Sequence, residues 1–433
     1  VTIVEASAGN LSLPETLKRI LQSSPDLVGI TATTSGICAA GELAQALKQS
    51  RSTRPILIGG CHVTALPEET LRGFPAFDLA VIGEGETTFR EILDAYSAQR
   101  ITPTGLPGTV ARKAPDGIHI NPPRPLISNL DELPLPAWSA LPGFPRAFHP
   151  APGRVRCRPC ASVVLTRGCP NRCTFCDRSV FGHQCRSYSP DYAMRLLRDL
   201  RDHFGVREIL IEDDTFVIRR PHVQEFCERL IAERLDLSWS CLGRADRVDL
   251  DLLRLMRKAG CWHISFGIES GNPDILHAVH KNLDIEQITR ALGWCREAGL
   301  KSKGFFMVGF PGETPATLEE TRALACALPL DDISVMQLTP FPGSDIYRTA
   351  EHYGTFEKNW RKMNALDAVF VPNGFTPETI EAARKKILRS FYGRPSILAR
   401  HAWETVRHPG SAPSLFRGFG ALLAMLFGRR SAG

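Results

Sequence analysis

The sequence lacks the features that would place a protein in a membrane, outside the cell or on nucleic acid. It has no signal-peptide pattern, and no uninterrupted apolar run reaches the roughly 20 residues that span a bilayer. Lys and Arg exceed Asp and Glu by only 52 to 46, and no basic stripe carries interleaved aromatic residues, so nucleic-acid binding is not expected. The 13 cysteines are dispersed, which favours a reducing cytoplasm over secretion.

The first part of the chain alternates strand and helix patterns. The predicted strands are residues 2–5, 27–31, 56–59 and 79–82, and the predicted helices are 13–21, 37–47 and 86–96. Continuous apolar strands between helices predict a parallel sheet that is covered on both faces. The chain starts inside a strand-like run without Met, so we expect the first strand and helix of this domain to be missing from the sequence.

Three cysteines, Cys169, Cys173 and Cys176, follow an apolar run at 161–166 that predicts a strand. Arg167 and Gly168 separate the strand from the cysteines, so the thiols are expected on a loop at a strand's C-terminal end. Thiolates bind iron–sulfur clusters or zinc. A four-iron cluster normally takes four cysteines, so three would leave one iron open to a small molecule. The alternative is a zinc knuckle that His183 or Cys185 completes.

The spacing C-x3-C-x2-C resembles the signature of the radical SAM superfamily. The resemblance implies a 4Fe-4S cluster on the three cysteines and S-adenosyl-L-methionine (SAM) on the open iron. Phe175, directly before the third cysteine, matches the aromatic residue that packs near the adenine in this family.

Six predicted strands, separated by five predicted helices, follow the linker region and suit the open (β/α)6 partial barrel of this family better than a closed barrel of eight. The strands are expected at 161–166, 208–212, 238–242, 262–266, 303–308 and 332–338. The helices are expected at 190–203, 221–233, 249–259, 284–298 and 315–328.

The strand ends carry the remaining SAM candidates that the resemblance implies. Carboxylates at the end of the second strand, Glu212, Asp213 and Asp214, suit the SAM ammonium, although the family's simpler members have GGE there. Arg244 suits the SAM carboxylate or, equally, a salt bridge, and Glu269 resembles the acidic residue that faces the nucleoside. Gly309, Pro311 and Gly312 resemble the loop that holds adenine through its backbone.

The loops after the N-terminal strands resemble those of the cobalamin-binding domain that precedes many radical SAM domains. The cobalamin candidates are Thr31, Ser35, Gly59, Gly60, His62, Val63, Gly83, Glu84 and Gly85. The family's DxHxxG motif would lie before the sequence given, so the lower cobalt ligand is open. We expect His62 to line the corrinoid edge or solvent and not to bind cobalt.

The expected fold is therefore α/β, with a flavodoxin-like (Rossmann-type) cobalamin-binding domain, a partial (β/α)6 TIM-like barrel and a helical C-terminal region. The expected regions are the cobalamin domain at 1–125, a Pro-rich linker at 126–155, the radical SAM domain at 156–370 and the helical region at 371–433. Cys157 and Cys160 are interpreted as ordinary thiols. The apolar tail at 414–430 predicts a helix that docks on the protein or lies at a membrane surface, which would add a peripheral membrane contact to a cytoplasmic protein.

The resemblance implies a cobalamin-dependent radical SAM enzyme, similar to anaerobic Mg-protoporphyrin ester cyclases, hopanoid-modifying enzymes and C-methylases. The expected reaction is abstraction of hydrogen from an unactivated carbon by a 5′-deoxyadenosyl radical, followed by C-methylation through methylcobalamin. Oxidative cyclisation or rearrangement without methyl transfer is the first alternative, and a zinc-containing corrinoid-binding sensor is the second. The expected partners are a small-molecule or lipid-like substrate and an external electron donor of the flavodoxin or ferredoxin type.

Overall fold

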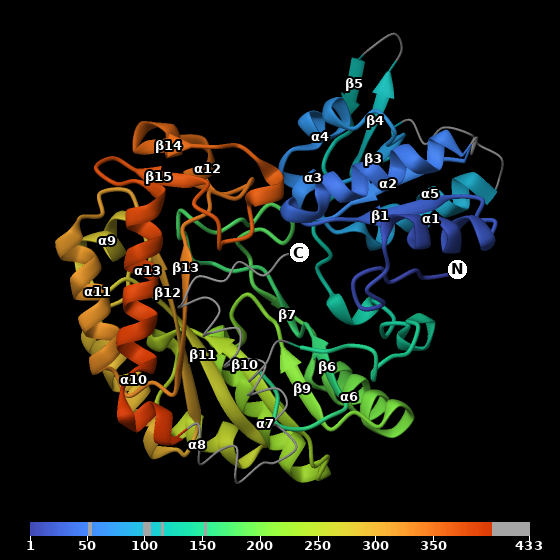
Figure 1. Cartoon of the computed structure of the whole chain (residues 1–433). Helices are drawn as coiled ribbons and strands as arrows, with labels where there is room; N and C mark the ends of the chain where they lie inside the picture. The colour runs from blue at the N-terminus through green and yellow to red at the C-terminus, as the bar shows by residue number, and fades with distance from the viewer. Residues whose placement is uncertain (51–53, 98–104, 114–116, 151–153, 401–433) are drawn as a thin grey trace.

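The computed structural model describes residues 1–50, 54–97, 105–113, 117–150 and 154–400. These residues build two separate parallel sheets (Figure 1). None of the helices in the described ranges is long and apolar enough to cross a bilayer. The predicted tail at 414–430 lies outside the described residues.

The N-terminal sheet has the order β1-β2-β3-β4-β5. Strands β1 (Val28–Thr31), β2 (Ile56–Gly59) and β3 (Leu79–Val81) are parallel, and the hairpin of β4 (Thr109–Lys113) and β5 (Gly117–Ile120) extends them in antiparallel fashion. The sequence did not predict this hairpin.

Helices cover both faces of this sheet. Successive side chains of a strand point to opposite sides, and in β2 the side chains on both sides are apolar. Ile56 and Ile58 pack with α1 (Leu13–Gln22), α2 (Ile37–Gln49) and α4 (Pro67–Gly73). Leu57 packs on the other face with Ile92 of α5 (Gly85–Ser97). The predicted strand at 2–5 is wrong, since these residues form no strand and β1 is the edge of the sheet.

The second sheet has six parallel strands in the order β13-β12-β11-β10-β9-β6. Its strands are β6 (Cys160–Val163), β9 (Glu208–Ile211), β10 (Ser238–Gly243), β11 (Cys261–Glu269), β12 (Lys301–Val308) and β13 (Asp332–Gln337). Its covering helices are α6 (Pro190–Phe204), α7 (Arg220–Glu233), α8 (Leu250–Lys258), α10 (Ile285–Glu297), α11 (Pro315–Ala327) and α13 (Pro377–Tyr392). Among the described residues β6 and β13 do not pair, so the barrel is open, and the predicted (β/α)6 architecture is confirmed.

Two small strands, β7 (Thr166–Arg167) and β8 (Arg186–Ser187), form an antiparallel pair beyond β6. The sequence predicted one strand over 161–166, but the structure divides it, because Val164 is exposed and Leu165 donates its amide to Asp213. A second hairpin, β14 (Gly354–Phe356) and β15 (Phe370–Pro372), follows α12 (Asp345–Thr349).

Candidate functional site

The three cysteines lie on the long loop between β7 and β8, above the C-terminal ends of the barrel strands. Thr174 anchors this loop, since its amide donates to the carbonyl of Val279 and its carbonyl accepts from the amide of Ile346, both at 3.0 Å. The guanidinium of Arg178 donates to the carbonyls of Asn171 at 2.7 Å and Cys173 at 3.3 Å. The cluster loop, residues 168–185, is therefore tied to the barrel and to itself.

Cys173 and Cys176 share one hydrogen bond, which lowers the pKa of the first thiol and, together with burial, raises that of the second. A hydrogen bond with the thiol of Cys176 lowers the pKa of Cys173 to about 6, against the effect of burial, and the charges of Lys281 and Arg244 act in the same direction. A thiol that ionises readily beside cations is a good thiolate ligand. Asn171 Nδ2 lies 3.2 Å from the Sγ atom of Cys169.

The zinc alternative requires ligands that converge on one ion. In the part of the chain that the structure describes, no three His, Cys, Asp or Glu side chains form such a group. A 4Fe-4S cluster makes a different demand, because each thiolate binds its own iron. The cluster loop supplies three such thiols, Cys169, Cys173 and Cys176.

The predicted SAM residues gather around the cluster loop. The ring of Phe175 lies 5.9 Å from the ring of Phe310, which belongs to the loop after β12. In that loop Gly309 and Gly312 adopt φ of +93° and +76°, conformations that favour glycine. Glu313 closes the turn by accepting from the amides of Gly309 and Phe310.

Glu269 is a buried residue at the end of β11 with φ of +70°. Its Oε1 atom accepts from the ammonium of Lys281 at 2.8 Å, and this ammonium lies 6.0 Å from the centre of the Phe175 ring. The sequence reasoning missed Lys281, because it lies in a loop after α9 (Pro273–Ala278) and not at a strand end. Arg244 is buried, pairs with Asp246 and donates to the carbonyl of Lys281 at 3.0 Å.

The acidic residues after β9 are engaged within the protein. Asp213 is buried, and its two oxygens accept from the amide of Leu165 at 2.7 Å and the hydroxyl of Thr166 at 2.9 Å. Asp214 is exposed and accepts from the amide of Gly168 at 3.1 Å. Glu212 pairs with Arg154 at 2.6 Å. Of the three, Asp214 is the carboxylate with the most exposed position beside the cluster loop.

The predicted cobalamin loops lie side by side at the C-terminal ends of β1, β2 and β3. The amide of Ala32 donates to the carbonyl of Gly59 at 3.1 Å, and the hydroxyl of Thr64 accepts from the amide of Gly83 at 3.1 Å. Gly60 has φ of +109°, and a Cβ atom there would lie 2.5 Å from the carbonyl oxygen of Ala32. The close packing therefore requires glycine at this position.

Three of the cobalamin candidates are buried in the protein, namely His62, Val63 and Glu84. Val63 belongs to the core of the first sheet. His62 is 1% exposed, and its ring packs at 4.7 Å against that of Trp360, a residue of η7 (Trp360–Lys362) between β14 and β15. Thr31 and Ser35, the latter in η1 (Thr34–Gly36), lie at the same edge, and Gly85 begins α5. His62 thus faces protein and not solvent, and its roles toward cobalamin stay predictions.

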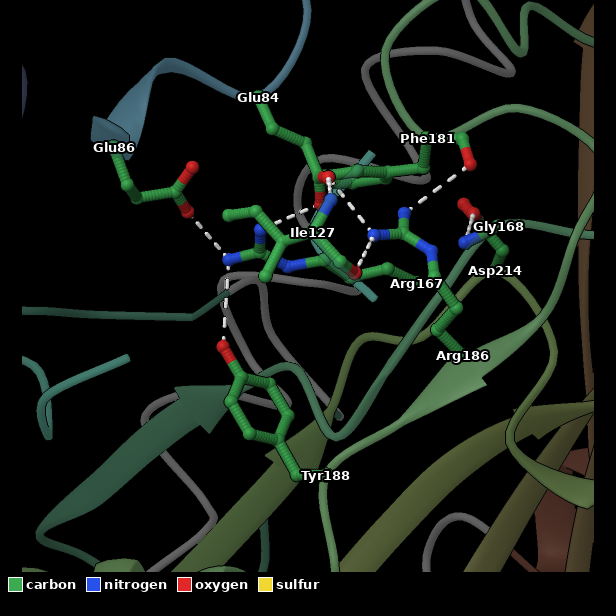
Figure 2. Close-up of polar contacts among 9 residues, drawn as sticks. All are labelled: Glu84, Glu86, Ile127, Arg167, Gly168, Phe181, Arg186, Tyr188 and Asp214. Atoms are coloured by element: carbon green, nitrogen blue, oxygen red, sulfur yellow. Dashed lines mark hydrogen bonds and ion pairs between the residues drawn. The ribbon is translucent and has the colours of Figure 1, made fainter. Parts of the chain in front are cut away.

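Glu84 lies where the two halves of the molecule meet, which are the N-terminal sheet with its helices and the barrel. Its Oε1 accepts from Arg167 at 2.8 Å, and its Oε2 accepts from Arg186 at 2.8 Å and from the amide of Ile127 at 2.7 Å (Figure 2). The side chain is therefore committed to protein donors, and the glycines Gly83 and Gly85 remain the cobalamin candidates of this loop. One carboxylate thus connects the loop after β3 to the residues that flank the cluster loop.

Comparison with known proteins agrees with this arrangement. Residues 163–325 match the model of the Radical SAM superfamily, and residues 1–93 match that of the B12 binding domain. An uncharacterized methyltransferase from Pyrococcus horikoshii is 35% identical over 406 residues, which are 93% of this chain and 86% of the relative.

Two further relatives have named functions. The anaerobic magnesium-protoporphyrin IX monomethyl ester cyclase of Rubrivivax gelatinosus is 31% identical over 80% of this chain, which spans only 62% of that relative. The structure of the radical SAM methyltransferase TsrM from Kitasatospora setae, with cobalamin and a [4Fe-4S] cluster bound, superposes with a TM-score of 0.67. It shares 19% identity and covers 81% of this chain and 69% of its own, so it shows a common fold. The chain belongs to the radical SAM superfamily and carries an N-terminal B12 binding domain.

Proposed function

We propose that this protein is a cobalamin-dependent radical SAM methyltransferase that transfers a methyl group to an unactivated carbon of a small molecule. The observation that carries the proposal is the direct contact between the two predicted cofactor sites, in which Glu84 of the corrinoid-domain loop binds Arg167, two residues before Cys169. Two cofactors that act on one substrate carbon need such a junction, because the reacting groups must be held close together.

When bound, the cluster and SAM supply a 5′-deoxyadenosyl radical, and cobalamin supplies the methyl group. The protein's own residues bind and orient these groups. Cys169, Cys173 and Cys176 hold the cluster, and Asp214 is the exposed carboxylate for the SAM ammonium.

Lys281 and Glu269 form a buried ion pair beside Phe175. We assign Glu269 to the SAM nucleoside and Lys281 to the SAM carboxylate. Phe175 and Phe310 form the apolar wall for adenine. The wall belongs to an apolar cluster that also contains Leu338 and Phe370. Such a wall excludes water, and a carbon radical must be shielded from water.

The first test is Cys173→Ala, assayed anaerobically for iron content and 5′-deoxyadenosine after cluster reconstitution. The variant should lose SAM cleavage, because one of three cluster ligands is gone. Cys185→Ala is the matched control and should retain the iron of the wild type. Retained SAM cleavage in Cys173→Ala would refute the cluster assignment, whereas zinc binding that depends on Cys185 would support the sensor alternative.

The second candidate function is oxidative cyclisation without methyl transfer, and the 31% identity to an anaerobic cyclase favours it. Product analysis separates the two functions. Methylation forms S-adenosylhomocysteine together with 5′-deoxyadenosine and adds one methylene to the product, whereas cyclisation adds no carbon. The assay needs a small-molecule or lipid extract as substrate source and a flavodoxin- or ferredoxin-type electron donor.

A further inference from the structure

The cluster loop has a narrow neck. Its two ends are the strands β7 and β8, which pair so that Arg167 lies opposite Arg186. Gly168, the first loop residue, has φ of +85°, and a Cβ atom there would lie 2.4 Å from the carbonyl oxygen of Gln184. The neck is therefore tightly closed, and every cluster cysteine lies beyond these two arginines.

Both neck arginines bind the same carboxylate, which comes from the other half of the molecule (Figure 2). The side chain of Glu84 is only 3% exposed, and those of Arg186 and Arg167 are 6% and 12% exposed. Arg186 also donates to the carbonyls of Ile127 at 2.7 Å and Phe181 at 3.3 Å. Glu84 thus joins the corrinoid-domain loop, the linker and the base of the cluster loop.

The charges in this contact balance. Arg167 binds Glu86 at 2.6 Å with its other terminal nitrogen, so two guanidinium groups face two carboxylates. Burial by itself would raise the pKa of Glu84, but the hydrogen bonds from Arg186, Arg167 and Ile127 outweigh this effect and lower the pKa. A buried network of this kind is stable only while each charge keeps its partner. Removing the charge of Glu84 would leave one carboxylate, that of Glu86, facing two guanidinium groups.

We propose that Glu84 is a positioning residue that holds the corrinoid-binding domain against the neck of the cluster loop and thereby sets the separation between corrinoid and cluster. The identity of the two cofactors rests on the proposed function, but the contact itself does not. Small displacements matter here, since a misplacement of about 1 Å can cost roughly 100-fold in rate.

The first experiment needs no cofactor. Amide hydrogen exchange is measured on the cofactor-free full chain of the wild type, Glu84→Gln and Glu86→Gln, over residues 83–86 and 168–185. Glu84→Gln keeps the shape of the side chain and should speed exchange in both segments by at least about fivefold. Glu86→Gln is the matched control, because the Glu86 side chain is 40% exposed and binds only one of the two arginines, and it should change exchange by less than about twofold. Equal exchange in the wild type and Glu84→Gln, or equal effects of the two variants, would overturn the proposal.

The second experiment measures the position of the cofactors by a spectroscopic signature. The protein is loaded with hydroxocobalamin and a reconstituted cluster, both are reduced to paramagnetic states, and their magnetic interaction is recorded by electron paramagnetic resonance. At equal cobalt and iron content, Glu84→Gln should weaken this interaction, and Arg186→Lys should weaken it less because it keeps the charge. An unchanged interaction in Glu84→Gln would contradict the positioning role. If the wild type binds neither cobalt nor iron, the proposed function fails and the exchange measurement decides the proposal alone.

Discussion

Buried carboxylates at the strand ends of this protein are already occupied by its own donors. Asp213 accepts from Leu165 and Thr166, Glu313 from two amides of its turn, and Glu84 from two arginines and Ile127. Each therefore fixes the shape of a loop next to a cofactor site. These three carboxylates are buried and bind donors of the protein, whereas the carboxylate of Asp214 is exposed. Burial therefore distinguishes the carboxylates that hold a loop from one that is open to a ligand.

Asp213 gives a pH prediction at this scale. Burial raises its pKa to about 7, because the charged form is poorly solvated even with its hydrogen bonds. A raised pKa in the folded state stabilises the fold below the unfolded pKa of about 4, and this stability is lost as the pH rises through about 7.

The thermal midpoint of the wild type should therefore fall between about pH 5 and about pH 8 by more than that of Asp213→Asn, at about 1 °C for each kcal/mol in a chain of 433 residues. Asn keeps an acceptor for the Leu165 amide, and Thr166 can reverse its hydrogen bond. The midpoint is measured by calorimetry at both pH values. Parallel pH profiles of the two proteins would show that Asp213 does not titrate in this range.

At the scale of elements, the conformation of Gly168 makes the cluster loop sensitive to a single methyl group. Gly168→Ala would force a Cβ atom against the carbonyl oxygens of Gln184 at 2.4 Å and Phe181 at 2.9 Å, at a φ of +85°. We expect a loss of stability of about 1–3 kcal/mol and severalfold less iron after reconstitution, because the neck must open.

Gly205→Ala is the control for this prediction. Gly205 ends α6 with a φ of +66°, but a Cβ atom there meets nothing within 4 Å, so only the backbone cost of about 1–2 kcal/mol applies. Iron content should stay at the wild-type level in this variant. Equal iron content in Gly168→Ala and Gly205→Ala would mean that the neck geometry does not control the cluster loop.

The elements also differ in how well the sequence predicted them. The strands β9 to β13 lie between helices that proline marks at their starts or glycine at their ends, so their ranges were predicted to within a few residues. The break between β6 and β7 was not, since it depends on a hydrogen bond from Leu165 to Asp213, which lies 48 residues later. The spacing of the cysteines identified the cluster loop. Lys281 and the bond from Arg167 to Glu84, 83 residues apart, are tertiary contacts that leave no periodic signal in the sequence.

At the scale of the whole molecule, a second contact joins the two halves through the hairpin of β14 and β15. Trp360 packs at 4.7 Å on His62 and at 6.0 Å on Phe74, and Arg361 forms an ion pair with Glu42 of α2. The segment that carries Trp360 follows the barrel in sequence, yet it covers the edge of the first sheet where the cobalamin candidates lie. The corrinoid domain is therefore contacted by the neck of the cluster loop, which follows the first barrel strand, and by the hairpin, which follows the last.

This contact predicts the behaviour of His62 in Trp360→Ala. Burial lowers the pKa of His62 to about 4, because the charged imidazolium would have no solvent. Removing the indole should admit water, so the pKa should rise toward its usual value of about 6.5. Exchange of the imidazole C2 proton, followed by mass spectrometry over a range of pH, measures this value. Trp360→Phe should retain the low pKa, since a ring still covers His62. A pKa that stays near its wild-type value in Trp360→Ala would mean that the first domain buries His62 without help from the hairpin.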